Sequence, residues 1–473
     1  MANTTLDAGP RAMKSSLAEL VRLAALPASA ANSVEIAGAD PVFPTRYKVV
    51  APGAAALAAT GLAAAELWAL KTGRRQQVRV NARAAAAALR SSRYLKINGE
   101  RPPEDPEKIT GFYPLRDGRW MYLHCNFFNL RDRNLAVLGA PAKKDAVAKA
   151  VATWDGIELE NTIFEAGGAC SFVRSEEEWR ALPQMQSVAR LPLLEIVKIG
   201  DAPPQSLPEG DRPLSGVRVL DLTRVLAGPT CAKTLAEHGA DVLRVTREDL
   251  ADSGPSDFDT GIGKLCTHID LRNPREAETM RSLIRESDVF SQSYRPGALA
   301  RHGLSAEALA KLRPGIVYVS LNAWGHEGPW RERRGYDTVV QSANGFAYRP
   351  GNERPVFLPV AAQDYIVGYL LAYGAMVALG RRVREGGSWL VRASLAGAGH
   401  WIREHGVLDE STYANLPPEL PESELQSLLM QHDSPVGRIT HLAPVVQMSE
   451  TPARWSRPAV PRGFHQPVWP ERG

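Results

Sequence analysis

Asp364 is the carboxylate whose place in the sequence best suits covalent chemistry. It stands immediately before the apolar run Tyr365–Leu379, which predicts a buried helix. At a helix N-terminus, exposed N–H groups and the helix dipole favour an ionised carboxylate and can stabilise a developing oxyanion. The same position also suits a residue that only caps the helix. Asp364 is therefore a candidate nucleophile, with helix capping as the alternative.

A second group of candidates consists of arginines that follow predicted strands or lie in turns. Open parallel sheets bind ligands beyond the carboxyl ends of their strands, where several guanidinium groups would converge on a polyanion. A phosphorylated ligand would suit such a rim, although each arginine taken alone is better explained as a solvated surface residue. These residues are Arg247, Arg272, Arg295, Arg301 and Arg334.

Other common catalytic motifs are missing from the sequence. The strand-turn-helix at Val219–Glu237 has no Gly-x-Gly-x-x-Gly, so a nicotinamide dehydrogenase is not indicated. Gly261–Lys264 lacks the first glycine and the hydroxyl residue of a phosphate loop, and neither Gly-x-Ser-x-Gly nor His-Glu-x-x-His occurs. The cysteines have no metal or redox spacing and are expected to be reduced, buried thiols: Cys125, Cys170, Cys231 and Cys266.

Composition narrows the class of protein further. The 473 residues are 44% hydrophobic and 23% charged, as in ordinary globular domains, and the net charge is only +4. Scattered lysines and arginines without an aromatic-interleaved patch argue against nucleic acid as a partner. The start lacks the features of a secretory signal. Ala51–Leu70 is apolar but contains Pro52 and Glu66, which favours a helix packed against protein over a membrane span. A cytoplasmic protein is expected.

Strands and helices alternate in the second half of the chain. The Pro-rich segment 201–213 is the best candidate for a linker. After it, short apolar strands alternate with helices at the spacing of βαβ units, which predicts an α/β fold with a Rossmann-like parallel sheet. The strands are expected at Val217–Leu222, Gly239–Val245, Asp288–Gln292 and Ile316–Leu321, and the helices at Thr230–Glu237, Arg275–Ser287 and Ala306–Leu312.

An internal repeat is the next feature. Asp364–Trp401 can be laid without a gap on Ala51–Ala88, and each copy predicts a long Ala-rich helix, a Gly turn and a short strand. Two Ala-rich helices can also resemble each other by composition alone. If the duplication is real, Asp364 falls opposite Ala51, and only the second copy retains the carboxylate.

Taken together, these segments resemble the class III CoA-transferases, the group that includes formyl-CoA:oxalate and carnitine CoA-transferases. The resemblance is strong from Pro213 to Ile402 and weak before that, and no single motif carries it. It rests on Leu214–Pro229, Gly239–Val245, Ile269–Arg272, Asp288–Phe290, Tyr294–Gly297, Ile316–Ser320, Gly328–Pro329, Arg334–Asp337, Gln341 and Ala362–Gly368.

The resemblance implies that Asp364 is the catalytic carboxylate and that CoA or acyl-CoA binds as a substrate, with no permanently bound cofactor and no metal. Three positions depart from the family pattern, namely Thr246, Ser293 and the segment Gly263–Cys266, and these affect the details of CoA affinity. The CoA contacts carried over are Leu226, Ala227, Arg247, Ile269, Asp270, Leu271, Arg272, Ser293, Tyr294, Arg295, Arg301, Arg334, Gly335, Tyr336 and Asp337.

The resemblance also implies an unusual domain order. It predicts an N-terminal extension (1–40), a partial and degenerate copy (41–200) that includes a smaller α+β domain (about 105–190), a linker (201–213), the CoA-binding catalytic domain (214–405) and a C-terminal return segment (406–473). Family subunits are interlocked rings, so a fused, asymmetric arrangement is expected and a homodimer is compatible with it.

The implied reaction moves CoA from an acyl-CoA to a carboxylic acid through an aspartyl anhydride and an aspartyl-CoA thioester. Two alternatives remain at this point. An α-methylacyl-CoA racemase would need a histidine where this chain has Tyr336, in Gly335-Tyr336-Asp337. A non-catalytic CoA-binding protein would fit the truncated first copy, but it would not explain why Asp364 is retained.

Overall fold

The structure is a computed structural model that describes residues 8–103, 108–250, 254 and 256–471. Its centre is a sheet of seven strands in the order β10-β9-β8-β11-β12-β13-β7. All neighbours are parallel except β7, which pairs antiparallel with β13 at the edge. The strands are β7 Glu195–Gly200, β8 Arg218–Leu222, β9 Asp241–Thr246, β10 Lys264–His268, β11 Val289–Gln292, β12 Val317–Asn322 and β13 Ser388–Ser394.

The order of the six parallel strands is that of a doubly wound sheet, with β8 in the middle and the chain running outward on both sides. Successive strand residues face opposite sides, so Val219 joins one core cluster and Leu220 the other. The fold class predicted from the sequence, a parallel α/β sheet domain with a smaller α+β domain, is confirmed. β7 lies before the predicted linker, yet it belongs to this sheet, and residues 201–213 carry neither helix nor strand.

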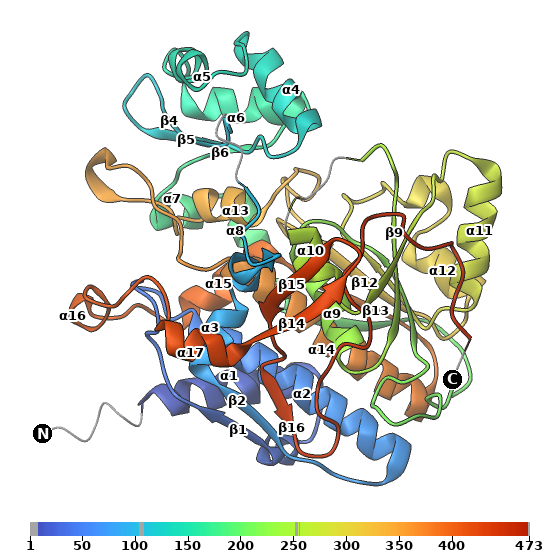
Figure 1. Cartoon of the computed structure of the whole chain (residues 1–473). Helices are drawn as coiled ribbons and strands as arrows, with labels where there is room; N and C mark the ends of the chain where they lie inside the picture. The colour runs from blue at the N-terminus through green and yellow to red at the C-terminus, as the bar shows by residue number, and fades with distance from the viewer. Residues whose placement is uncertain (1–7, 104–107, 251–253, 255, 472–473) are drawn as a thin grey trace, which may run out of the picture.

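Helices cover both faces of the sheet (Figure 1). On one side, α11 and α12 pack on Leu243 and Phe290, and on the other side α9 and α14 pack on Val242 and Val289. The helices of this domain are α9 Ala227–Glu237, α10 Ser256–Gly261, α11 Pro274–Arg285, α12 Ala306–Leu312, α13 Asp337–Ala343, α14 Ala362–Glu385 and α15 Leu395–Glu404, with 3-10 turns at Ala300–His302 and Pro350–Asn352.

The N-terminal part of the chain packs against the outer side of α14. Its long helix α2 (Val50–Thr72) contacts α14 directly, and both helices are mostly buried. By length and composition either could cross a membrane, but their burial in one core marks them as interior helices, as predicted for α2. The other elements here are α1 Ala8–Leu23, β1 Val34–Ala37, β2 Val78–Asn81, α3 Ala82–Ala88 and β3 Lys96–Ile97, with 3-10 turns at Ala28–Ser33 and Ser91–Tyr94.

The C-terminal segment returns to this N-terminal part. β16 extends the sheet of β1 and β2, and β3 pairs with β15 in a second sheet of three strands. The chain then runs back to the large sheet, where the Trp469 indole donates to the Leu283 carbonyl of α11 at 3.0 Å. The return elements are α16 Glu410–Tyr413, α17 Glu422–Leu428, β14 Leu429–Ser434, β15 Gly437–Leu442 and β16 Val446–Met448.

A small domain, residues 109–172, forms a separate lobe at the top of Figure 1. Its antiparallel sheet β4-β5-β6 is covered by helices that bury their own core around Met121, Ile163 and Phe172. Its elements are β4 Gly111–Pro114, β5 Trp120–Leu123, α4 Phe128–Leu138, α5 Lys144–Val151, α6 Gly156–Glu165 and β6 Cys170–Phe172, and α7 Glu176–Ala181 and α8 Pro183–Val188 lead back to the main body.

The two halves of the predicted repeat have matching elements. The offset of 313 residues that places Ala51 on Asp364 also places α2 on α14, β2 within β13, and the start of α3 on the start of α15. Each long helix ends at a glycine with positive φ, Gly73 at 75° and Gly386 at 67°. The repeated element order agrees with the sequence alignment, and common descent of the two halves remains a prediction.

Gly368 sets how closely α14 approaches α9. A Cβ at this position would lie 2.6 Å from the Ala227 carbonyl oxygen, whereas at Gly380 of the same helix the nearest atom would be 3.5 Å away. We expect Gly368→Ala to lower the free energy of unfolding by about 1 to 3 kcal/mol through overpacking. Gly380→Ala should raise it by up to about 1 kcal/mol through helix propensity. Urea unfolding of both variants checks this, and equal effects of the two would contradict the packing argument.

Candidate active site

Asp364 lies at the start of α14 and lines a large cavity. It is the third residue of the helix, 8% exposed, and its backbone N–H donates to Asp337 Oδ2 at 3.0 Å. The residue before the helix, Ala361, offers no side-chain cap. Asp364 is therefore not the N-cap that the sequence alternative required. Its carboxylate instead borders the cavity one turn before Gly368, where α14 contacts the first turn of α9.

Asp337 is the hydrogen-bond partner that holds the first turn of α14 in place. It is the first residue of α13, and its carboxylate accepts hydrogen bonds from the Asp364 backbone and from the Gln341 side chain. Burial raises the pKa of Asp337 to about 6 despite these hydrogen bonds. Burial and the neighbouring Asp337 charge raise the pKa of Asp364 well above its ordinary value. Ionising both carboxyl groups in the same dry wall is unfavourable, so Asp364 is a carboxylate of unusually high basicity.

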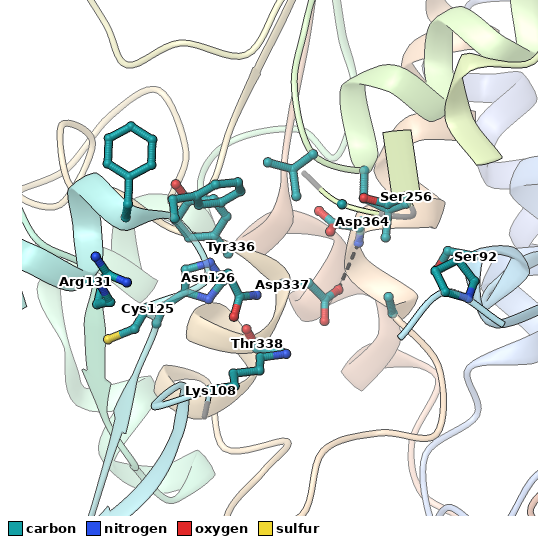
Figure 2. Close-up of a pocket in the computed structure, with 18 of the residues that line it drawn as sticks. Ser92, Lys108, Cys125, Asn126, Arg131, Ser256, Tyr336, Asp337, Thr338 and Asp364 are labelled. Carbon is teal, nitrogen blue, oxygen red and sulfur yellow. Dashed lines mark hydrogen bonds between the residues drawn. The ribbon is translucent and has the colours of Figure 1, made fainter. Parts of the chain in front are cut away.

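The large cavity has a volume of about 1390 Å³ and lies where three parts of the chain meet. Figure 2 shows Asn126 and Lys108 of the small-domain side facing Tyr336 and Asp337, with Ser92 and Ser256 across from them and Asp364 between. A cavity of this size accommodates a ligand larger than a typical small molecule. The small domain therefore forms one wall of the site.

A strained turn borders the cavity at the carboxyl end of β8. Val225 has φ of +73°, a conformation that β-branched residues rarely adopt. Asp221 stabilises the turn. Its carboxylate accepts hydrogen bonds from the Thr223 hydroxyl at 2.5 Å and from Lys264 Nζ at 2.8 Å. Leu226 follows and lines the cavity, and Ala227 opens α9. The turn thus presents backbone to the cavity at the edge where parallel sheets bind ligands.

A smaller cavity of about 130 Å³ adjoins the large one, because Leu250 lines both. Its wall contains Arg247, Arg272 and Arg301, together with the aromatic ring of Tyr294. Arg247 and Arg272 both pair with Asp249. The predicted residues that gather here are Arg247, Ile269, Asp270, Leu271, Arg272, Tyr294 and Arg301.

Some of the predicted contacts line one of these two neighbouring cavities, and the others line neither. Leu226, Tyr336 and Asp337 line the large cavity with Asp364. The other predicted contacts line neither cavity. Ser293 accepts a hydrogen bond from the backbone N–H of Arg224, in the strained turn, at 3.2 Å. Burial and the neighbouring Arg295 lower the pKa of Arg334. The predicted contacts outside both cavities are Ala227, Ser293, Arg295, Arg334 and Gly335.

Sequence reasoning missed the wall that comes from the first half of the chain. It includes the cations Arg93, Arg101, Lys108 and Arg131, and also His124. No motif marks these residues. His124 and Arg131 reach the cavity with the small domain, whereas Arg93, Arg101 and Lys108 come from the segment that precedes it. As predicted from the sequence, the four cysteines are buried free thiols.

Comparison with known proteins finds relatives that are named as CoA-transferases. Residues 214–420 match the profile of CoA-transferase family III. An acetyl-coenzyme A transferase from Hypoxylon pulicicidum is 29% identical over 70% of this chain and 59% of its own length. The succinyl-CoA:glutarate CoA-transferase of Mus musculus is 36% identical over 41% of this chain and 47% of its own. A CAIB/BAIF family protein from Brucella suis aligns in structure with a TM-score of 0.38 and 28% identity over 41% of this chain and 56% of its own.

The chain spans between 47 and 59% of the length of these curated relatives. The matched segment runs from β8 through α16. It includes Asp364 and the parts of the sheet domain that line the two cavities. The family resemblance predicted from the sequence is confirmed. Residues 214–420 of this chain are thus similar to CoA-transferase family III, the family that the sequence analysis indicated.

Proposed function

We propose that this protein transfers CoA from an acyl-CoA to a carboxylic acid, with Asp364 as the nucleophile. The observation that carries the proposal is the Asp364 carboxylate in the wall of a cavity that adjoins an arginine-lined pocket. Arginine forks suit the phosphates of CoA, and a pantetheine arm would have to run past Leu250 to bring the thioester to Asp364. Binding energy from the distant phosphates would then orient the reacting carbonyl.

The proposed reaction has two symmetrical halves. Asp364 attacks the thioester carbonyl and expels CoA thiolate, which leaves a mixed anhydride on the aspartyl oxygen. The thiolate attacks the aspartyl carbonyl of that anhydride, releases the first carboxylic acid as its carboxylate and forms an aspartyl-CoA thioester. The second carboxylate attacks this thioester, and the thiolate set free then attacks the new acyl carbonyl. Acyl-CoA leaves, and Asp364 is a carboxylate again.

The environment of Asp364 fits this role. A carboxylate with a raised pKa is more nucleophilic once ionised, and its buried wall keeps water from the anhydride. Cationic side chains at the cavity, Arg93, Arg101, Lys108 and Arg131, would attract the acceptor carboxylate. Names of relatives such as succinyl-CoA:glutarate CoA-transferase support dicarboxylic acids as the first acceptors to test, with succinyl-CoA as the first donor.

Asp364→Asn tests the nucleophile without changing its shape. Transfer should be abolished, while CoA should still raise the melting temperature, because the phosphates bind elsewhere. Wild-type protein incubated with acyl-CoA and then hydroxylamine should carry a hydroxamate on the peptide that contains Asp364. A racemase would instead exchange the substrate α-proton with solvent deuterium, and a binding protein would do neither. Transfer at the wild-type rate in Asp364→Asn would refute the proposal.

Asp364→Asn also tests how the buried carboxyl group makes the stability of the protein depend on pH. The pKa of Asp364 is raised on folding, so the folded state holds the proton more tightly than the unfolded chain. The stability of the wild type should therefore fall as pH rises above the ordinary aspartate range, and Asp364→Asn should escape this loss. Melting temperatures at pH 5 and pH 8 should show the variant gaining on the wild type as pH rises. A constant difference would contradict burial of the charge.

Asp337→Asn tests the coupling between the two carboxyl groups. An amide oxygen can still accept the Asp364 N–H, but the neighbouring negative charge is gone. The pKa of Asp364 should fall, and the acidic limb of the kcat/KM profile should move to lower pH. The pH profiles of the wild type and the variant check this. A limb that stays in place would show that Asp337 does not set the basicity of Asp364.

Arg247→Ala tests the phosphate site. It should weaken CoA binding by about tenfold, since one charge-assisted contact is lost. Arg285→Ala is the matched control, because Arg285 lies on α11, lines neither cavity and pairs with Glu278. CoA titrations followed by melting temperature compare the two. Equal CoA responses of both variants and the wild type would place the phosphates elsewhere.

A further inference from the structure

Asp249 lies in a short turn at the border between the two cavities. The turn follows β9, and it is closed by the Leu250 N–H, which donates to the Arg247 carbonyl at 3.2 Å. Asp249 lines the large cavity, Arg247 lines the arginine-lined pocket, and Leu250 lines both. This turn therefore belongs to the walls of both cavities at the place where they adjoin.

The Asp249 carboxylate pairs with two arginines. One oxygen accepts a hydrogen bond from Arg247 Nε, and the other accepts one from Arg272 Nη2 at 3.3 Å. Arg247 follows β9 and Arg272 follows β10, which are parallel neighbours, so both side chains start from the same edge of the sheet. The hydrogen bond from Arg247, together with the charges of both arginines, lowers the pKa of Asp249. The carboxylate is therefore ionised at neutral pH.

The three arginines of the pocket differ in their internal partners. Arg272 pairs with Asp270, at 2.5 Å, as well as with Asp249. For Arg247, Asp249 is the one carboxylate partner within the described part of the chain. Arg301 donates to a backbone carbonyl and has no carboxylate partner among the described residues. Asp249 is therefore the acid that neutralises Arg247.

The ion pair between Asp249 and Arg247 is open to solvent. The Asp249 side chain is 53% exposed and that of Arg247 is 34% exposed. Exposed ion pairs contribute little to stability, because water screens the charges and both side chains lose conformational freedom. A terminal phosphate group carries more charge than a carboxylate and offers three oxygens to guanidinium donors. A phosphate that enters the pocket can therefore displace Asp249 from Arg247.

We propose that Asp249 is an internal competitor for the phosphates of CoA. Its carboxylate occupies Arg247 and Arg272 until a phosphate replaces it, and it returns to these arginines when the phosphate leaves. This inference rests on the proposed function for the identity of the ligand. The competition holds the affinity for CoA below the value that the arginines alone would give, and it favours release of the acyl-CoA product.

Asp249→Asn tests this competition, because it keeps the shape of the side chain and removes its charge. Calorimetry should show that the variant binds CoA about two- to fivefold more tightly, which is the range for the loss of one exposed ion pair. Pantetheine has the thiol arm of CoA but no phosphate, so it should bind equally to the variant and the wild type. Asp433→Asn is the control, because Asp433 on β14 is another exposed aspartate that pairs with an arginine, and it lines neither cavity. Unchanged or weaker CoA binding in Asp249→Asn would overturn the proposal.

A double variant separates competition from simple charge repulsion. If Asp249 acts by pairing with Arg247, the gain from Asp249→Asn should shrink in an Arg247→Ala background, because the contested arginine is gone. An undiminished gain would mean that Asp249 only repels the ligand, and it would refute the competition. These measurements need no turnover, so CoA binding that follows this pattern without any transfer would contradict the proposed function alone. Absence of CoA binding in both the wild type and Asp249→Asn would contradict both proposals.

Discussion

The structure depends on the burial of α14 on all its sides. From Ala362 to Gly380 every residue of this helix is buried, so it needs a packing partner on each face. The sheet and α9 supply one side and α2 the other. Gly368 allows α14 and α9 to approach closely at the end where Asp364 begins the helix. The position of the carboxylate is therefore a consequence of core packing, and the N-terminal half of the chain is part of the support for the site.

Two aspartates show which features of the site belong to the fold and which to function. Asp40 accepts the N–H groups of Val50 and Ala51 at the start of α2, at 2.9 and 2.7 Å, as Asp337 accepts that of Asp364 at the start of α14. Burial raises the pKa of both acceptors to about 6. Ala51 and Asp364 are equivalent in the predicted repeat. An upstream aspartate thus caps the helix whether the equivalent position holds Asp364 or Ala51, so helix formation does not require Asp364.

Local patterns in the sequence predicted much of the sheet and little of the cavity. The alternation of apolar strands and helices gave most elements of the second half to within a few residues. It missed β10, because a strand that starts with Lys264 looks exposed until the buried carboxylate of Asp221 is known to pair with it. Asp364 was predicted from its position before an apolar run and from family resemblance. His124 and Arg131 come from the small domain, and Arg93, Arg101 and Lys108 come from the segment before it. Contacts between distant parts of the chain leave no periodic signal in a single sequence.

The candidate site combines several unfavourable features in a small volume. Val225 holds a strained backbone conformation, Asp337 and Asp364 compete for ionisation, and the ring nitrogens of His124 have no hydrogen-bond partner among the described residues. Each of these lowers the stability of the folded protein, and the large buried core around α14 is what tolerates them. They share one property, since all of these residues line the same cavity. Their concentration at one cavity, rather than any one of them, is the physical reason for choosing this cavity as the candidate active site.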